Sequence, residues 1–256
     1  HMVASTPGGS ALFTANIGTI TNQIFAAAFP KYAHDRKLML ERYLQVTKVI
    51  AFFSFPIMCC MAVAAEPMIT LVYTEKWSAA ILPFQILTVF AVFRSVTSSY
   101  GAVINSLQVP HIAFYPLLVY APIHLAVAIA CGQYGIVTLA LGVVTLKVLY
   151  LQFRIYQVSV LLHSSVQKFY SNLRPTLLAC AAAILFGMGV GFLGIANAWL
   201  ELSAISLVFL ISFWGIFQII GQRDLTIIRD FFLKTNPRVG LVFARLFMLP
   251  HVQATP

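Results

Sequence analysis

The chain has 256 residues, of which 60% are hydrophobic and only 9% are charged, and its formal net charge is +9. Soluble domains carry about 25% charged residues, so this composition excludes an ordinary soluble domain and indicates an integral membrane protein. The positive charge does not indicate nucleic-acid binding, because the lysines and arginines cluster in the gaps between apolar segments, as in the cytoplasmic loops of membrane proteins.

The order of apolar segments predicts an all-α polytopic bundle of about seven spans. Residues 1–9 are small and polar, and we expect them to be disordered; residues 10–220 form the seven-helix bundle, and residues 221–256 form a basic amphipathic tail in the cytoplasm. Each segment is long enough to cross a bilayer. The predicted spans are 10–30, 43–68, 71–108, 111–131, 134–154, 176–196 and 199–220. Amphipathic segments at 33–43, 163–175, 223–234 and 238–249 are predicted to lie in the membrane interface. Pro56 is expected to kink the second span.

The basic residues predict the orientation of this bundle. Fourteen of the sixteen lysines and arginines fall on one side of the membrane, Lys76 falls on the other side, and Arg94 lies within a span. The positive-inside rule therefore places the start of the chain outside and the tail in the cytoplasm. Lys48 and Lys147 lie slightly inside their spans, and we expect their ammonium groups to snorkel to the surface.

The strongest functional signal lies in the third span, 71–108. From Arg94 the spacing through Ser98, Gly101 and Asn105 places polar groups along one helical face. A cation at membrane depth costs about 2.5–3.5 kcal/mol on insertion scales, so it usually faces a cavity. A guanidinium binds phosphate bidentately, and Arg94, Ser98 and Asn105 are therefore candidate residues for binding an anionic substrate. The alternative is an arginine that bonds backbone carbonyls at a helix kink.

Two weaker candidates lie in other spans. Asn16, Thr19 and Gln23 follow one face of the first span, where they could bond sugar hydroxyls or join helices without a ligand. Glu66 could carry a proton if it were buried. Its neighbour Pro67 and the charged turn nearby favour an exposed acid at a helix end instead.

No motif predicts catalysis, a metal site or a cofactor. The four cysteines lack metal-ligand spacing and are interpreted as packing residues: Cys59, Cys60, Cys131 and Cys180. Residues 189–194 match G-x-G-x-x-G, but no strand precedes them, so the structural context of a dinucleotide site is missing. Gly187 and Gly191 instead form a G-x-x-x-G pair that permits close helix approach.

Four segments resemble a known family: AAAFPKYAHDRKLMLERYLQ (26–45), MITLVYTEKWSAAILPFQIL (68–87), FRSVTSSYGAVINSL (93–107) and QYGIVTLALGVV (133–144). They are similar to the C-terminal half of lipopolysaccharide and colanic-acid-type polysaccharide exporters. These Wzx-like flippases belong to the superfamily of multidrug, oligosaccharidyl-lipid and polysaccharide flippases. The likeness covers about residues 11–160. Its motifs are Phe29-Pro30 followed by Asp35, then Lys76-Trp77, then Arg94-Ser95 ahead of Gly101. Thr74 stands where the family commonly has glycine, a departure that bears on the shape of that turn.

The resemblance implies a fold of fourteen helices in two pseudo-symmetric bundles, of which this chain would supply the second. Such proteins move lipid-linked saccharides of the polyprenyl diphosphate type across the inner membrane by alternating access. The implied partners are that substrate, membrane lipids and a missing N-terminal half, with no nucleic acid. In this setting Arg94 would capture the diphosphate.

Other functions remain open at this stage. A multidrug exporter of the same superfamily is one alternative, although an intramembrane cation and the scarcity of acids argue against cationic drugs. A membrane enzyme such as a polysaccharide polymerase or acyltransferase is another, although the predicted outer loops are short. A third is a membrane scaffold without transport activity.

Overall fold

The computed structural model describes residues 34–193, 195 and 197–235, with the side chains of 223 and 230–235 excepted. All the regular structure in this part of the chain is helical. The helices are α2 (Arg36–Val63), α3 (Ala65–Tyr73), η2 (Glu75–Ala80), α4 (Ile81–Val96), α5 (Tyr100–Ser106), α6 (His111–Gly132), α7 (Ile136–Leu161), α8 (Val166–Gly191), α9 (Ala198–Ile220) and α10 (Gln222–Thr235).

The prediction of a polytopic all-α bundle is confirmed. Among the described residues, six helical segments are long and apolar enough to cross a membrane, with Glu75–Ser106 counted as one segment. They correspond to the second through seventh predicted spans. The first predicted span, 10–30, with Asn16, Thr19 and Gln23, lies outside the described residues, as does the segment 238–249.

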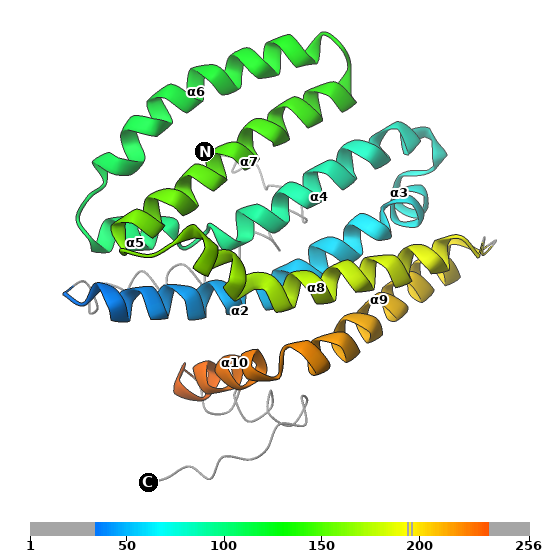
Figure 1. The fold of residues 1–256 in the computed structure, drawn as a ribbon. Coiled ribbons are helices and arrows are strands. Elements are labelled where there is room, and N and C mark those ends of the chain that lie inside the picture. Colours follow the sequence, from blue (N-terminus) through cyan, green and yellow to red (C-terminus); the bar gives the residue numbers. More distant parts are fainter. Residues whose placement is uncertain (1–33, 194, 196, 236–256) are drawn as a thin grey trace, which may run out of the picture.

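The helices form a row in which α2 is central (Figure 1). On one side of α2 lies α4, then α7, and then α6 at the edge; on the other side lie α8 and α9, which pack closely together. α10 turns back from the end of α9 and contacts both α2 and α9. Because α6 lies at the edge of the row, none of the residues that the structure describes in α6 is buried.

The core gathers around α2. Phe52 of α2 packs against Phe213 and Phe217 of α9, with ring centroids 6.0 and 4.9 Å apart, and Tyr43 stacks on Phe169 of α8. Close approach of α8 depends on Gly187, where an added Cβ would lie 3.2 Å from Val63. Gly187 thus has the role predicted for a small residue between helices. Gly191 does not, because the space beside it is open.

The basic segment 33–43 is not a separate interfacial helix. The carboxylate of Asp35 accepts hydrogen bonds from the backbone N–H groups of Lys37 and Leu38, at 3.0 and 3.1 Å, and this N-cap starts α2 at Arg36. The 28 residues of α2 would extend ~42 Å at 1.5 Å per residue, which exceeds the ~30 Å hydrocarbon core. An untilted α2 would therefore extend beyond the hydrocarbon core. The polar segment 163–175 likewise becomes the first part of α8.

The third predicted span is one segment by hydropathy but several helices by geometry. Between α4 and α5, residues 97–99 form turns. The hydroxyls of Ser95 and Thr97 donate to the backbone carbonyls of Val92 and Arg94, at 2.8 and 3.1 Å. Hydroxyl groups that bond the backbone in this way compete with the helical hydrogen bonds and bend helices. The run of Ser and Thr at 95–99 thus explains the break.

Lys48 does not snorkel as predicted, and Lys147 contacts a neighbouring helix. Lys48 is only 8% exposed, and its ammonium pairs with the carboxylate of Asp224 on α10. Lys147 is half-buried and lies over the ring of Phe90 on α4, 5.2 Å from the ring centroid. Both ammonium groups found partners on neighbouring helices, which a single apolar segment cannot reveal.

The helix predicted over 223–234 is present as α10, but its apolar face does not rest on lipid throughout. Leu225 and Ile228 are fully buried where α10 packs on α2 and α9. Part of the apolar face that the sequence assigned to the membrane is therefore packed against the protein.

Candidate anion-binding face of α4, α5 and α7

Arg94 lies in the last turn of α4 with an exposed side chain. Its guanidinium has no hydrogen bond or ion pair with any described residue. Its neighbour Ser95 takes the opposite role: its hydroxyl lies 2.8 Å from that of Ser54 and joins α4 to α2. At the helix break it is Thr97, not the guanidinium, that bonds a backbone carbonyl. The Arg-Ser pair thus combines a helix-joining hydroxyl with a cation left available.

The other residues predicted on this face also point away from the core. Ser98 is half-buried and Asn105 is exposed, and an added Cβ at Gly101 would meet no atom within 4 Å. Tyr100 and Val103, between them in sequence, are buried. Ser98, Gly101 and Asn105 therefore share an outward side of the α4–α5 segment with Arg94, although the break at 97–99 interrupts the continuous helix that the sequence predicted.

A second cation, Lys147, contacts α4 from the neighbouring helix α7. Lys147 of α7 is positioned over the Phe90 ring, and Phe90 precedes Arg94 by four residues in α4. Residues four apart are neighbours on a helix surface, with Cβ atoms about 5–6 Å apart. The ring that Lys147 covers therefore lies about one helical turn before Arg94 on α4.

A third cation, Arg154, lies further along α7. Its guanidinium carbon is 4.1 Å from the centroid of the Tyr100 ring and 5.6 Å from that of Tyr150, and its Nε is buried without a hydrogen-bond partner. The Tyr100 hydroxyl donates to Gln157 Oε1 at 2.7 Å, and Gln157 Nε2 donates to the carbonyl of Ile112 at 2.9 Å. This chain of bonds fixes the ring on which the guanidinium rests.

The sequence did not identify Lys147 and Arg154 as site residues. Both were assigned to the cytoplasmic charge count, yet they stand seven residues apart, which places them on one face of α7. That spacing inside an apolar segment was the available signal. The spacing could not show that these two cations lie over aromatic rings from α4 and α5.

Among the acidic side chains that the structure describes, none neutralises these three cations. The acidic side chains that the structure describes do not contact Arg94, Lys147 or Arg154; they are Asp35, Glu41, Glu66, Glu75, Glu201 and Asp224. Glu66 is exposed in the first turn of α3, as expected for an acid at a helix end. Cations held at low dielectric are stabilised by an anionic partner, so the face formed by these residues suits a ligand with several negative charges.

Comparison with known proteins agrees with this chemistry in broad terms. A family described as "Polysaccharide biosynthesis protein" matches residues 5–82. The chain is also similar to the teichuronic acid biosynthesis protein TuaB of Bacillus subtilis (strain 168), with 27% identity over 99 residues. That match covers 39% of this chain and 20% of the relative, so the chain aligns with about a fifth of the relative's length. No solved structure matches the chain significantly. These matches support a role in polysaccharide synthesis or export for a multi-pass membrane protein.

Proposed function

We propose that the chain is part of a flippase that moves lipid-linked saccharide precursors across the inner membrane by alternating access. The face of α4, α5 and α7 binds the diphosphate that links the polyprenyl chain to the sugar, and Arg94 makes the first contact with it. Ser98 and Asn105 bond the adjoining oxygens. Asn16, Thr19 and Gln23 of the predicted first span remain candidates for the sugar hydroxyls.

One observation carries this proposal: Lys147 and Arg154 of α7 lie over rings of α4 and α5, the two helices that flank and hold Arg94, and no described carboxylate contacts any of the three cations. A guanidinium donates two parallel hydrogen bonds to a phosphate, and charge-assisted bonds of this kind are roughly twice as strong as neutral ones. A diphosphate carries several negative charges and can neutralise the three cations. A cationic drug would be repelled by the same face, which argues against the multidrug alternative.

The whole transporter requires further partners. Repeat-built transporters place the substrate site between two halves, so we propose that an N-terminal half completes the cavity beside α4 and α7. The basic tail lies in the cytoplasm. We propose that the protein has no catalytic activity of its own.

Export of surface polysaccharide in cells that depend on the complete protein tests the proposal. Arg94→Gln is expected to reduce export about 10–100-fold, because a hydrogen bond to a charged group contributes about 1.5–3 kcal/mol. Arg94→Lys should retain part of the activity, since an ammonium keeps the charge but not the bidentate geometry.

The matched control is Arg174→Gln, which removes an exposed arginine of α8 and should leave export unchanged. Wild-type export by Arg94→Gln at equal protein level would overturn the assignment. A cell-free assay with purified protein and lipid-linked sugar separates the enzymatic alternative: formation of longer saccharides would identify a polymerase.

A further inference from the structure

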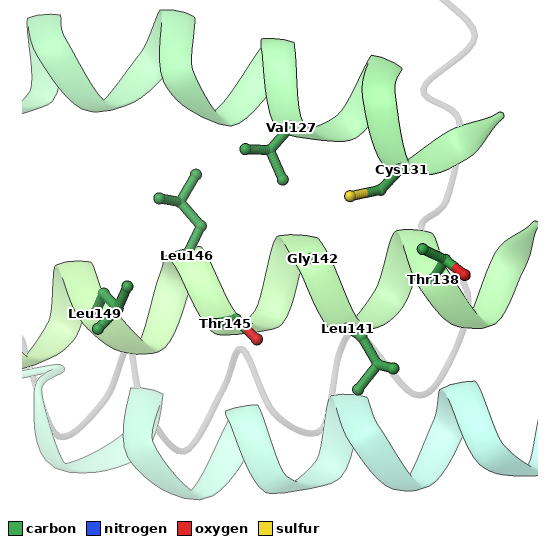
Figure 2. A pocket seen from close by; sticks show the side chains of 8 residues that line it. All are labelled: Val127, Cys131, Thr138, Leu141, Gly142, Thr145, Leu146 and Leu149. Carbon is green, nitrogen blue, oxygen red and sulfur yellow. The ribbon is translucent and has the colours of Figure 1, made fainter. Parts of the chain in front are cut away.

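A groove between α6 and α7 shares no lining residue with the anion-binding face. Its volume is about 440 Å³, and it is lined by Val127 and Cys131 of α6 and by Thr138, Leu141, Gly142, Thr145, Leu146 and Leu149 of α7. Figure 2 shows Val127, Cys131 and Leu146 pointing into the space between the two helices. Apart from two threonine hydroxyls the lining side chains are apolar, and one of these hydroxyls, that of Thr138, already donates to the carbonyl of Tyr134.

Gly142 shapes this groove. An added Cβ at this position would lie 2.4 Å from Cys131 Sγ and 3.3 Å from Val127 Cγ1. The two helices therefore touch at Gly142, while larger side chains on either side of it hold them apart. The resulting trough runs along α7, and its apolar lining suits an apolar chain.

The character of the α6–α7 contact changes beyond Leu149. The rings of Tyr120 and Tyr150 stack with centroids 4.2 Å apart, and His124 lies against Tyr120 at 5.4 Å. Arg154 follows on α7, 5.6 Å from the Tyr150 ring. Two buried nitrogen atoms in this region, His124 Nε2 and Arg154 Nε, have no hydrogen-bond partner. An apolar trough thus leads to an aromatic pair and then to polar groups with unused bonding capacity.

This order of surfaces, first apolar, then aromatic, then cationic, matches an anionic lipid. The length of the path indicates which kind of lipid fits. From Thr138 to Arg154 the path follows sixteen residues of α7, or ~24 Å at 1.5 Å per residue. One leaflet is ~15 Å deep, half of the hydrocarbon core. A phospholipid acyl chain confined to one leaflet is too short for a path of this length when its phosphate lies at Arg154. A polyprenyl chain is long enough.

We propose that the α6–α7 groove holds the polyprenyl chain of a lipid phosphate whose head lies at Arg154. The inference rests on the proposed function, since it assigns the path of the same substrate's tail. It places the tail on the outer edge of the bundle, while the sugar-bearing head reaches the cations on the α4 side of α7.

The test uses the full chain in nanodiscs of neutral phosphatidylcholine, with a long-chain polyprenyl monophosphate and phosphatidic acid as probes. Both lipids carry a phosphomonoester, so they differ in the chain. Thr145→Trp fills the groove from an exposed position. It should weaken polyprenyl monophosphate binding at least about tenfold, the loss expected when roughly two methylene groups lose their burial. Phosphatidic acid binding should stay unchanged.

Val119→Trp is the matched control, because Val119 is exposed on α6 and does not line the groove; it should bind both probes as the wild type does. Leu149→Trp, at the other end of the groove, repeats the test if Thr145→Trp fails to fold. Equal loss of both lipids would identify a general phospholipid site and overturn the proposal. Wild-type binding of the polyprenyl probe by both variants would overturn it as well.

The outcomes for the head and the tail are separable. If the groove assignment fails and the function holds, the tryptophan variants bind normally while Arg94→Gln still loses export. If the function fails, Arg94→Gln exports normally, whatever the tryptophan variants do to lipid binding.

Discussion

Thr74 adopts φ 71° and ψ 167° between α3 and η2. This region of backbone space is essentially restricted to glycine, and a β-branched residue there is strained by about 1–3 kcal/mol. The same position is where the resembled exporter family commonly carries glycine.

Replacing Thr74 by glycine should stabilise the protein. The relief of strain outweighs the greater chain entropy of glycine, which is about 0.5–1 kcal/mol, so the expected gain in unfolding free energy is about 1 kcal/mol. Thermal unfolding of the purified protein in detergent measures it. Thr70→Gly is the control: Thr70 lies inside α3 with its hydroxyl bonded to the Glu66 carbonyl, so this change should lower the melting temperature. A lower melting temperature for Thr74→Gly would show that the turn does not strain threonine.

Individual residues divide into those that sequence could place and those it could not. Helical spacing alone determines which side chains share a face, and Arg94, Gly101 and Asn105 do lie on an exposed side; that Arg94 faces a cavity and binds substrate stays a prediction. The burial of Lys48 and the ring contact of Arg154 were not foreseen, since their partners Asp224 and Tyr100 lie more than fifty residues away in sequence. Contacts between helices are set by packing, which hydropathy does not encode.

At the scale of elements, apolar length gave the spanning helices to within a few residues at many ends. It did not give their junctions. The Ser and Thr hydroxyls that break the helix at 97–99, and the Asp35 cap that extends α2, act through single hydrogen bonds. Such bonds change where a helix begins or ends without changing its hydropathy.

α10 is the element whose position depends most on one buried pair. Asp224 and Lys48 have side chains that are 9% and 10% exposed, and the second carboxylate oxygen of Asp224 has no partner. Gly221 permits the tight turn that brings the pair together, because an added Cβ would lie 2.8 Å from the Phe217 ring. The ion pair and the apolar residues Leu225 and Ile228 hold α10 on the bundle.

Removing one member of this pair should be far worse than removing both. Lys48→Met or Asp224→Leu alone should lower the unfolding free energy by about 3–5 kcal/mol, because either change leaves an uncompensated buried charge, whereas the double variant should be near neutral. Unfolding by denaturing detergent, combined into a double-mutant cycle, measures the difference. Additive losses in the double variant would mean that the two groups do not compensate each other.

The whole molecule has two chemically different rims. Arg36 Nη1 donates to the carbonyl of Leu161 at 2.5 Å, and Asn172 Nδ2 donates to that of Leu44 at 2.9 Å. These bonds bring the start of α2, the end of α7 and the start of α8 to one rim, where the basic residues gather. Three acidic residues lie at the opposite rim, in the first turns of α3, η2 and α9: Glu66, Glu75 and Glu201.

This arrangement predicts which rim faces the cytoplasm. The positive-inside rule orients membrane proteins by the lysines and arginines of short loops, so the rim that contains Arg36 should be cytoplasmic. Gln133, in the α6–α7 connection, and Gln167, at the start of α8, are both exposed and lie at opposite rims. In a variant whose four cysteines are replaced by alanine, Gln133→Cys should react with a membrane-impermeant maleimide on intact cells. Gln167→Cys should react only after permeabilisation. The reverse pattern would place Arg94 in the opposite half of the membrane, so that the anion-binding face would meet its lipid from outside, and the direction of transport proposed for this bundle would be inverted.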